Sequence, residues 1–200
     1  LIGRASTTGP AGATRVAIVI DVSGSTTDPS GSADPAINTI LKAETAAARL
    51  LIDELERIDA KAPGTAFEVA LLTFSSDAQI LRPLTKMTDP AGVQKLRDAL
   101  DTLAKTPPKG DTDYPAALRE AQKAFRATER RGPSIILFLT DGAPSSGRKN
   151  LVPPSLDSAV QLGQQGIVLH AIGLGADFLG KVDAKAAFPP DPRGGANILA

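Results

Sequence analysis

The chain has 200 residues, of which 42% are hydrophobic and 22% are charged, and its formal net charge is zero. This length and composition suit one globular domain with a substantial apolar core. The balanced charge argues against a nucleic-acid partner, and no apolar run reaches the ~18 residues that a membrane span requires. Cysteine is absent, which excludes disulfides and thiolate metal sites but leaves the cell compartment open.

The beginning of the chain differs in composition from the rest. Residues 1–13 are rich in Gly, Ala, Ser and Thr and show no hydrophobic period. We therefore expect a linker or N-terminal arm there, before a single domain over residues 14–200. The first residue is Leu and no signal-peptide pattern follows, which suggests a piece of a longer protein. The abundance of Ala, Pro and Gly favours a bacterial source.

Strand-like and helix-like patterns alternate along the chain. Short apolar runs predict strands at residues 14–20, 66–74, 78–84, 133–140, 167–172 and 195–200. A 3.6-residue apolar period predicts helices at residues 37–58, 89–103, 114–128 and 155–165, with a shorter one at 178–187. Asp89 and Pro90 are typical of a helix start, and we expect Asp89 to cap the second helix. The alternation predicts parallel βαβ units, in which the strands joined by the short turn at residues 75–77 are antiparallel.

Polar residues follow two of the predicted strands at the point where each strand ends. Asp21-Val22-Ser23-Gly24-Ser25 follows the first strand, Thr140-Asp141-Gly142 follows a later one, and Thr112 precedes a helix between them. In open α/β sheets, ligands bind outside the carboxyl ends of the strands, where the strand order reverses. Carboxylate and hydroxyl oxygens suit a hard cation such as Mg²⁺. The sequence therefore predicts one oxygen-only metal site, built from Asp21, Ser23, Ser25, Thr112 and Asp141.

This constellation resembles the metal-ion-dependent adhesion site of von Willebrand factor type A domains, the family that includes integrin I domains. The family pattern is D-x-S-x-S, then a distant Thr, then an Asp in a T-D-G-like turn, and all of these are present here in order. The resemblance extends from about residue 15 to near the end of the chain. It implies an α/β, doubly wound fold with a mostly parallel central sheet, one antiparallel edge strand and helices on both faces.

The resemblance also implies how each residue acts. Ser23, Ser25 and Thr112 would bind one divalent cation directly, while Asp21 and Asp141 would supply negative charge, directly or through water. Mg²⁺ is favoured, although Ca²⁺ and Mn²⁺ suit the same oxygens. A partner protein would offer an Asp or Glu side chain to the open position on the ion. The loops at residues 26–35, 104–113 and 141–154 would contact the partner, with these candidate residues: Thr26, Asp28, Asp111, Asp113, Arg148 and Lys149.

These inferences predict a divalent-cation-dependent protein-binding module, used for adhesion or interaction and without catalytic activity. We expect it outside the cytoplasm or at the cell surface, as part of a longer protein. The alternative is a non-catalytic subunit or scaffold of an intracellular AAA+ or chelatase-type assembly, because domains of this family serve there too.

Enzyme classes with similar motifs lack residues that they need here. A phosphotransferase of the haloacid dehalogenase kind requires a second Asp where Ser23 stands, and no G-x-S-x-G nucleophile elbow is present. The glycines at 173 and 175 do not complete a G-x-G-x-x-G dinucleotide motif. Two local roles stay open: Thr112 or Asp113 would cap the helix that begins near Tyr114, and His170, the only histidine, is expected to be structural.

Overall fold

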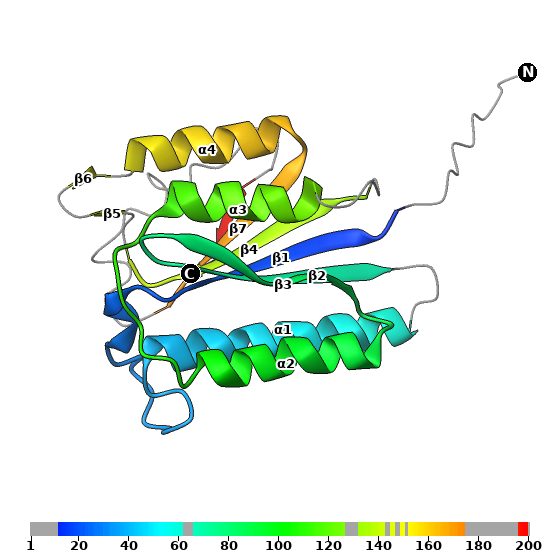
Figure 1. The fold of residues 1–200 in the computed structure, drawn as a ribbon, viewed down its shortest axis with the longest axis horizontal. Helices are drawn as coiled ribbons and strands as arrows, with labels where there is room; N and C mark the ends of the chain where they lie inside the picture. The colour runs from blue at the N-terminus through cyan, green and yellow to red at the C-terminus, as the bar shows by residue number, and fades with distance from the viewer. Residues whose placement is uncertain are drawn as a thin grey trace, which may run out of the picture.

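The computed structural model describes residues 12–61, 66–126, 132–142, 145–146, 149–150, 152–174 and 196–199. Its centre is a six-stranded sheet of order β3-β2-β1-β4-β7-β8, with helices on both faces (Figure 1). The strands of this sheet are β1 (Thr14–Asp21), β2 (Phe67–Phe74), β3 (Ala78–Lys86), β4 (Ser134–Thr140), β7 (Ile167–Gly173) and β8 (Ala196–Leu199). The helices are η1 (Gly24–Thr27, a 3-10 helix), α1 (Ile40–Lys61), α2 (Pro90–Leu103), α3 (Tyr114–Arg126) and α4 (Val152–Gln164).

The strand directions confirm the predicted fold class. β1 is parallel to both β2 and β4, and β4, β7 and β8 continue the parallel order. β3 is antiparallel to β2, as the short turn between them requires. β3 lies at one edge of the sheet. The predicted strand at residues 195–200 is present as β8, at the opposite edge.

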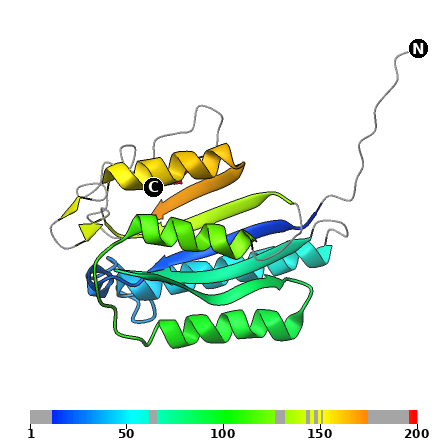
Figure 2. The same cartoon turned by 45° about the horizontal axis from the view of Figure 1, so that its top comes forward.

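The two faces of the sheet carry different pairs of helices. α1 and α2 cover one face, while α3 and α4 cover the other (Figure 2). Successive residues of a strand point to opposite faces, so β1 contributes to both layers. Val16, Ile18 and Ile20 pack in the layer of α1 and α2, whereas Ala17 and Val19 pack in the layer of α3 and α4. Burial on both faces explains why β1 is a continuous apolar run.

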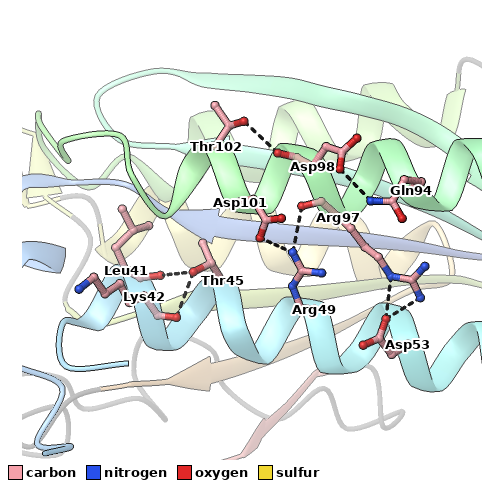
Figure 3. A network of polar contacts seen from close by, with 10 residues as sticks. All are labelled: Leu41, Lys42, Thr45, Arg49, Asp53, Gln94, Arg97, Asp98, Asp101 and Thr102. Carbon is pink, nitrogen blue, oxygen red and sulfur yellow. Dashed lines mark hydrogen bonds and ion pairs between the residues drawn. The ribbon is translucent and has the colours of Figure 1, made fainter. Parts of the chain in front are cut away.

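A set of polar contacts joins α1 to α2 along their exposed edges (Figure 3). Arg97 on α2 donates to Asp53 on α1 from Nε at 2.9 Å and from Nη2 at 2.7 Å. Arg49 on α1 forms an ion pair with Asp101 on α2 in the opposite direction. These contacts hold the two helices in a fixed register above the apolar layer.

Some predicted boundaries are wrong, for local reasons. α1 begins at Ile40 and not at residue 37, because Ile37 closes a turn by donating its backbone N–H to the Asp34 carbonyl at 3.0 Å. α4 begins at Val152 and not at residue 155, and two prolines lie in its first turn, where no backbone N–H is needed. A two-stranded ladder of β5 (Ser145–Ser146) and β6 (Lys149–Asn150) occupies part of the predicted loop before α4.

Asp89 stands at the N-cap position of α2, but its side chain makes no capping hydrogen bond there. Of the expected arm at residues 1–13, residues 1–11 lie outside the described residues, as does the expected short helix at residues 178–187. Over the part of the chain that the structure describes, no helix has both the length and the hydrophobicity of a membrane span.

Candidate metal centre

The strand order reverses between β1 and β4, because the chain adds β2 and β3 on one side of β1 and β4 on the other. Asp21 is the last residue of β1, and Asp141 follows the last residue of β4. The two strands are parallel, so both carboxylates come to the same edge of the sheet. Both residues are buried, with 0% and 3% of their surface exposed. This is the position where the sequence predicts a site.

The turn after β1 is held by the carboxylate of Asp21. Its Oδ1 accepts the backbone N–H of Ser23 at 2.8 Å. The hydroxyl and the N–H of Thr26 both donate to the Ser23 carbonyl, at 2.9 and 3.1 Å, which closes the short helix η1. Ser23 is a buried residue, and Ser25 is an exposed residue of the same turn.

Three side-chain oxygens from the turn and from the β4 end lie close together. Ser23 Oγ is 3.1 Å from Ser25 Oγ, and Ser25 Oγ donates to Asp141 Oδ1 at 2.9 Å. An octahedral Mg²⁺ with bonds of about 2.0–2.1 Å places adjacent ligand oxygens about 2.9 Å apart. The two distances from Ser25 Oγ are thus close to the spacing of neighbouring corners of a magnesium octahedron. This donor set fits a hard divalent cation.

Both carboxylate oxygens of Asp21 already accept hydrogen bonds from the protein. Its Oδ1 accepts the Ser23 N–H, and its Oδ2 accepts the Thr140 hydroxyl at 2.7 Å. Burial raises the pKa of Asp21 to about 6, hydrogen bonds from Ser23 and Thr140 oppose the shift, and the charge of Asp141 adds to it. Neither Asp21 nor Glu44 forms an ion pair with any described Lys or Arg. A cation at this edge would offset the cost of burying negative charge.

The loop that carries Thr112 is tied to the turn by backbone hydrogen bonds. Gly24 donates its N–H to the Gly110 carbonyl at 3.0 Å, and Lys109 donates to the Val22 carbonyl at 2.9 Å. Thr112 is buried, with 6% of its surface exposed. Asp113 caps α3, because its Oδ1 accepts the Ala116 N–H at 2.8 Å. The sequence left either Thr112 or Asp113 as the cap of this helix, and in the structure the cap is Asp113.

The candidate contact residues differ in accessibility. Thr26, named as a possible partner contact, is fully buried, and its hydroxyl supports the turn. Asp28 is exposed and Asp111 is half-buried. Arg148 lies outside the described residues, and Lys149 is placed as part of β6.

The loop predicted at residues 26–35 begins later and closes on itself. A β-bridge joins Pro29 to Thr39, and the Ile40 N–H donates to the Asp28 carbonyl at 3.0 Å. The residues between these ends, 31–36, are mostly exposed. The two ends of the loop are therefore held together by the bridge from Pro29 to Thr39 and by the hydrogen bond from Ile40 to Asp28.

Sequence reasoning missed two residues beside the site. Glu44 on α1 is fully buried; burial raises its pKa well above the ordinary value, and the charges of Asp21 and Asp141 raise it further. The sequence feature that could have identified Glu44 is its charge at a position within the apolar stripe of the helix. Tyr114, the only tyrosine, donates its hydroxyl to the Gly142 carbonyl at 2.6 Å and lies 3.0 Å from the Thr140 hydroxyl. Nothing in its sequence context marks that contact.

The described residues form no group of three or more His, Cys, Asp or Glu placed to hold a metal ion. A site at this edge therefore depends on the serine and threonine hydroxyls as well as on carboxylates.

This fold and this arrangement define an open α/β domain with a hydroxyl-rich site at its switch point. Residues 16–143 match the von Willebrand factor type A domain, and the chain belongs to this family. Among curated proteins there is no significant match.

Solved structures share the fold at low identity. A von Willebrand factor type A protein from Catenulispora acidiphila aligns with a TM-score of 0.63 and 18% identity, covering 94% of this chain and 39% of that one. The pilus adhesin SpaC from Lactobacillus rhamnosus GG aligns at 0.59 and 17%, covering 80% and 24%. Proximal thread matrix protein 1 from the mussel byssus, with a zinc-occupied metal-ion-dependent adhesion site, aligns at 0.52 and 23%, covering 82% and 36%. The chain thus spans well under half of each of these three structures.

Proposed function

We propose that this domain is a divalent-cation-dependent protein-binding module with a complete metal-ion-dependent adhesion site. The observation that carries the proposal is the 2.9–3.1 Å spacing of the Ser23, Ser25 and Asp141 oxygens at the switch point of the sheet. Ser23, Ser25 and Thr112 would hold the ion, and Asp21 and Asp141 would supply its counter-charge. The mussel structure, in which zinc occupies such a site, supports this assignment.

When bound, the ion would supply an electrophilic centre for an anionic oxygen of the partner. The residues of this chain set that property, because Ser and Thr hydroxyls are neutral and withdraw little of the positive charge. Asp21, with both oxygens hydrogen-bonded, fixes the turn and contributes charge from behind the hydroxyls. Ser25 is exposed, so the ligand set opens toward solvent on its side. An Asp or Glu side chain of a partner protein is the group that fits such a position, and Mg²⁺ is the favoured ion.

The module acts by binding and carries out no reaction. The adhesin SpaC, which shares the fold, supports a role in adhesion or protein interaction outside the cytoplasm, in a bacterial protein longer than this chain. The partner would contact the exposed loop at residues 31–36, which follows η1, and the loop at residues 104–113, which carries Thr112.

Calorimetric titration of the metal-free chain with Mg²⁺, Ca²⁺ and Mn²⁺ tests the proposal. We expect one binding site in the wild type and at least a roughly tenfold weaker affinity in Ser25→Ala, which removes one proposed ligand oxygen. Thr27→Ala is the matched control, because the Thr27 hydroxyl lies in the same turn but donates to the Gly24 carbonyl. Absence of binding in the wild type, with and without a peptide rich in Asp and Glu, would contradict the proposal and leave the fold as a scaffold.

A further inference from the structure

Glu44 occupies a place in α1 where an apolar residue would be expected. Its residue surface is 0% exposed, and neither carboxyl oxygen has a hydrogen bond of normal geometry to the described residues. Leu41, Ala48 and Ile52 continue the same helix into the apolar layer over the sheet. A buried carboxyl without partners destabilises a fold, whereas Leu or Met would complete this layer. The chain therefore keeps a costly group at this position.

The position of Glu44 relates it to the metal edge. α1 packs against η1 and β1, the elements that carry the site turn. Burial raises the pKa of Glu44 most, the charges of Asp21 and Asp141 raise it further, and the Asp21 backbone N–H opposes the shift. Arg49 and Arg97 join α1 to α2 at the surface, as Figure 3 shows, on a side of α1 other than that of the buried Glu44. α1 thus places Glu44 beside the elements that form the site turn, and among the described residues no Lys or Arg pairs with it.

We propose that Glu44 is a further member of the metal site, an outer carboxylate that accepts hydrogen bonds from water molecules bound to the ion. Direct binding is not the role we assign, because the described acidic side chains do not form a group of three that could hold one ion. Groups of this kind orient bound water and add negative charge, and their removal weakens metal binding. The inference rests on the proposed function, since it assigns Glu44 to the same ion.

This role predicts opposite effects on the two states of the protein. In the metal-free protein, Glu44→Gln removes a buried acid and should raise the melting temperature or leave it unchanged. In the metal-bound protein, the same change removes a negative charge and an acceptor, and affinity should fall roughly 10–100-fold. A residue that only supports the fold would not show this pair of effects.

The test compares the wild type, Glu44→Gln and Glu54→Gln in the full 200-residue chain. Glu54 is the matched control, because it lies on the same helix but is exposed and paired with Arg57. Titration with Mg²⁺ and Mn²⁺ gives affinity, and thermal unfolding in chelator gives metal-free stability. Weaker binding in Glu44→Gln alone, without loss of metal-free stability, is the expected result.

Three results would overturn the inference. Affinity of Glu44→Gln within about twofold of wild type would remove Glu44 from the site while leaving the proposed function intact. A lower metal-free melting temperature of Glu44→Gln would mark the residue as a structural one. Failure of the wild type itself to bind either ion would overturn the proposed function together with the role of Glu44.

Discussion

At the scale of single residues, the site combines negative charge with deep burial. The Asp21 carboxylate is fully buried, is bound by Ser23 and Thr140, and lies near the charge of Asp141. Tyr114 extends this set, because its hydroxyl links the Gly142 carbonyl to Thr140. One hydroxyl thus connects the start of α3 to the turn that carries Asp141. The pH dependence of folding should report the charge at this edge.

Folding raises the pKa of Asp21 from 3.8 to about 6. A carboxyl with a raised pKa stabilises the fold while protonated, so its contribution is full below pH 3.8 and is lost as the pH rises through 6. A rise of the pKa from 3.8 to about 6 corresponds to roughly 3 kcal/mol. In metal-free protein, the wild type should therefore lose more unfolding free energy than Asp21→Asn between about pH 4 and pH 7. Denaturant unfolding at each pH measures the difference, and a difference that does not change with pH would contradict the prediction.

At the scale of elements, the loop before α3, which carries Thr112, is hydrogen-bonded to the site turn through Lys109 and Gly110. This loop is held from both sides: Gly110 accepts from Gly24, and Asp111 donates its N–H to Ser76 Oγ at 2.9 Å. Gly110 has φ of +93°, in the left-handed region, and an added Cβ would lie 2.8 Å from Ser76 Oγ. The tight approach explains why glycine stands there.

Gly110→Ala should therefore lower both stability and metal affinity. The left-handed backbone alone costs about 1–2 kcal/mol for a residue with a side chain, and the contact with Ser76 adds to it. Gly31→Ala is the control, because Gly31 has φ of +88° but an added Cβ meets nothing within 4 Å. Denaturant unfolding should show a loss for both variants, whereas Mg²⁺ titration should show a loss for Gly110→Ala only. Equal metal affinity of the two variants would separate this loop from the site.

Much of this arrangement could be predicted from the sequence, because each feature has a local cause. Apolar runs on both faces predict β1 and β4, and their polar ends predict the place of Asp21 and Asp141. The predicted start of α4 at residue 155 is too late, since two prolines stand in the first turn, a position that accepts them. Glu44 was missed because burial depends on how α1 packs against the sheet, which helical periodicity alone does not give. The hydrogen bonds of Tyr114 likewise join segments 26 and 28 residues apart.

At the scale of the whole molecule, the site joins parts of the chain that fold from distant segments. Asp21 and Asp141 are supplied by β1 and by the turn after β4, and Thr112 by a loop between them in sequence. An ion bound there would bridge all three. Ligand binding to the native state stabilises the entire fold, because the unfolded chain does not bring these oxygens together.

Removal of divalent metal should therefore lower the melting temperature. At a metal concentration of 100 times Kd, binding stabilises the fold by about 2.7 kcal/mol. For a chain of this size that corresponds to a shift of roughly 5–10 °C. Calorimetry with Mg²⁺ and with chelator, at equal ionic strength, measures the shift. Ser25→Ala should show a much smaller shift, and an equal shift in that variant would place the stabilising ion elsewhere.

The pinned loop between Pro29 and Thr39 has a consequence for how such a domain diversifies. Its two ends are joined by a β-bridge and by the hydrogen bond from Ile40 to Asp28, before the chain enters α1. Insertions or exchanges at residues 31–36 would change an exposed surface while the paired ends keep their place before α1. The domain could thus keep its metal site unchanged while the loop at residues 31–36 varies, as the loops of an antibody vary on a constant framework. Libraries of sequences placed at this point would sample new partners on an unchanged scaffold.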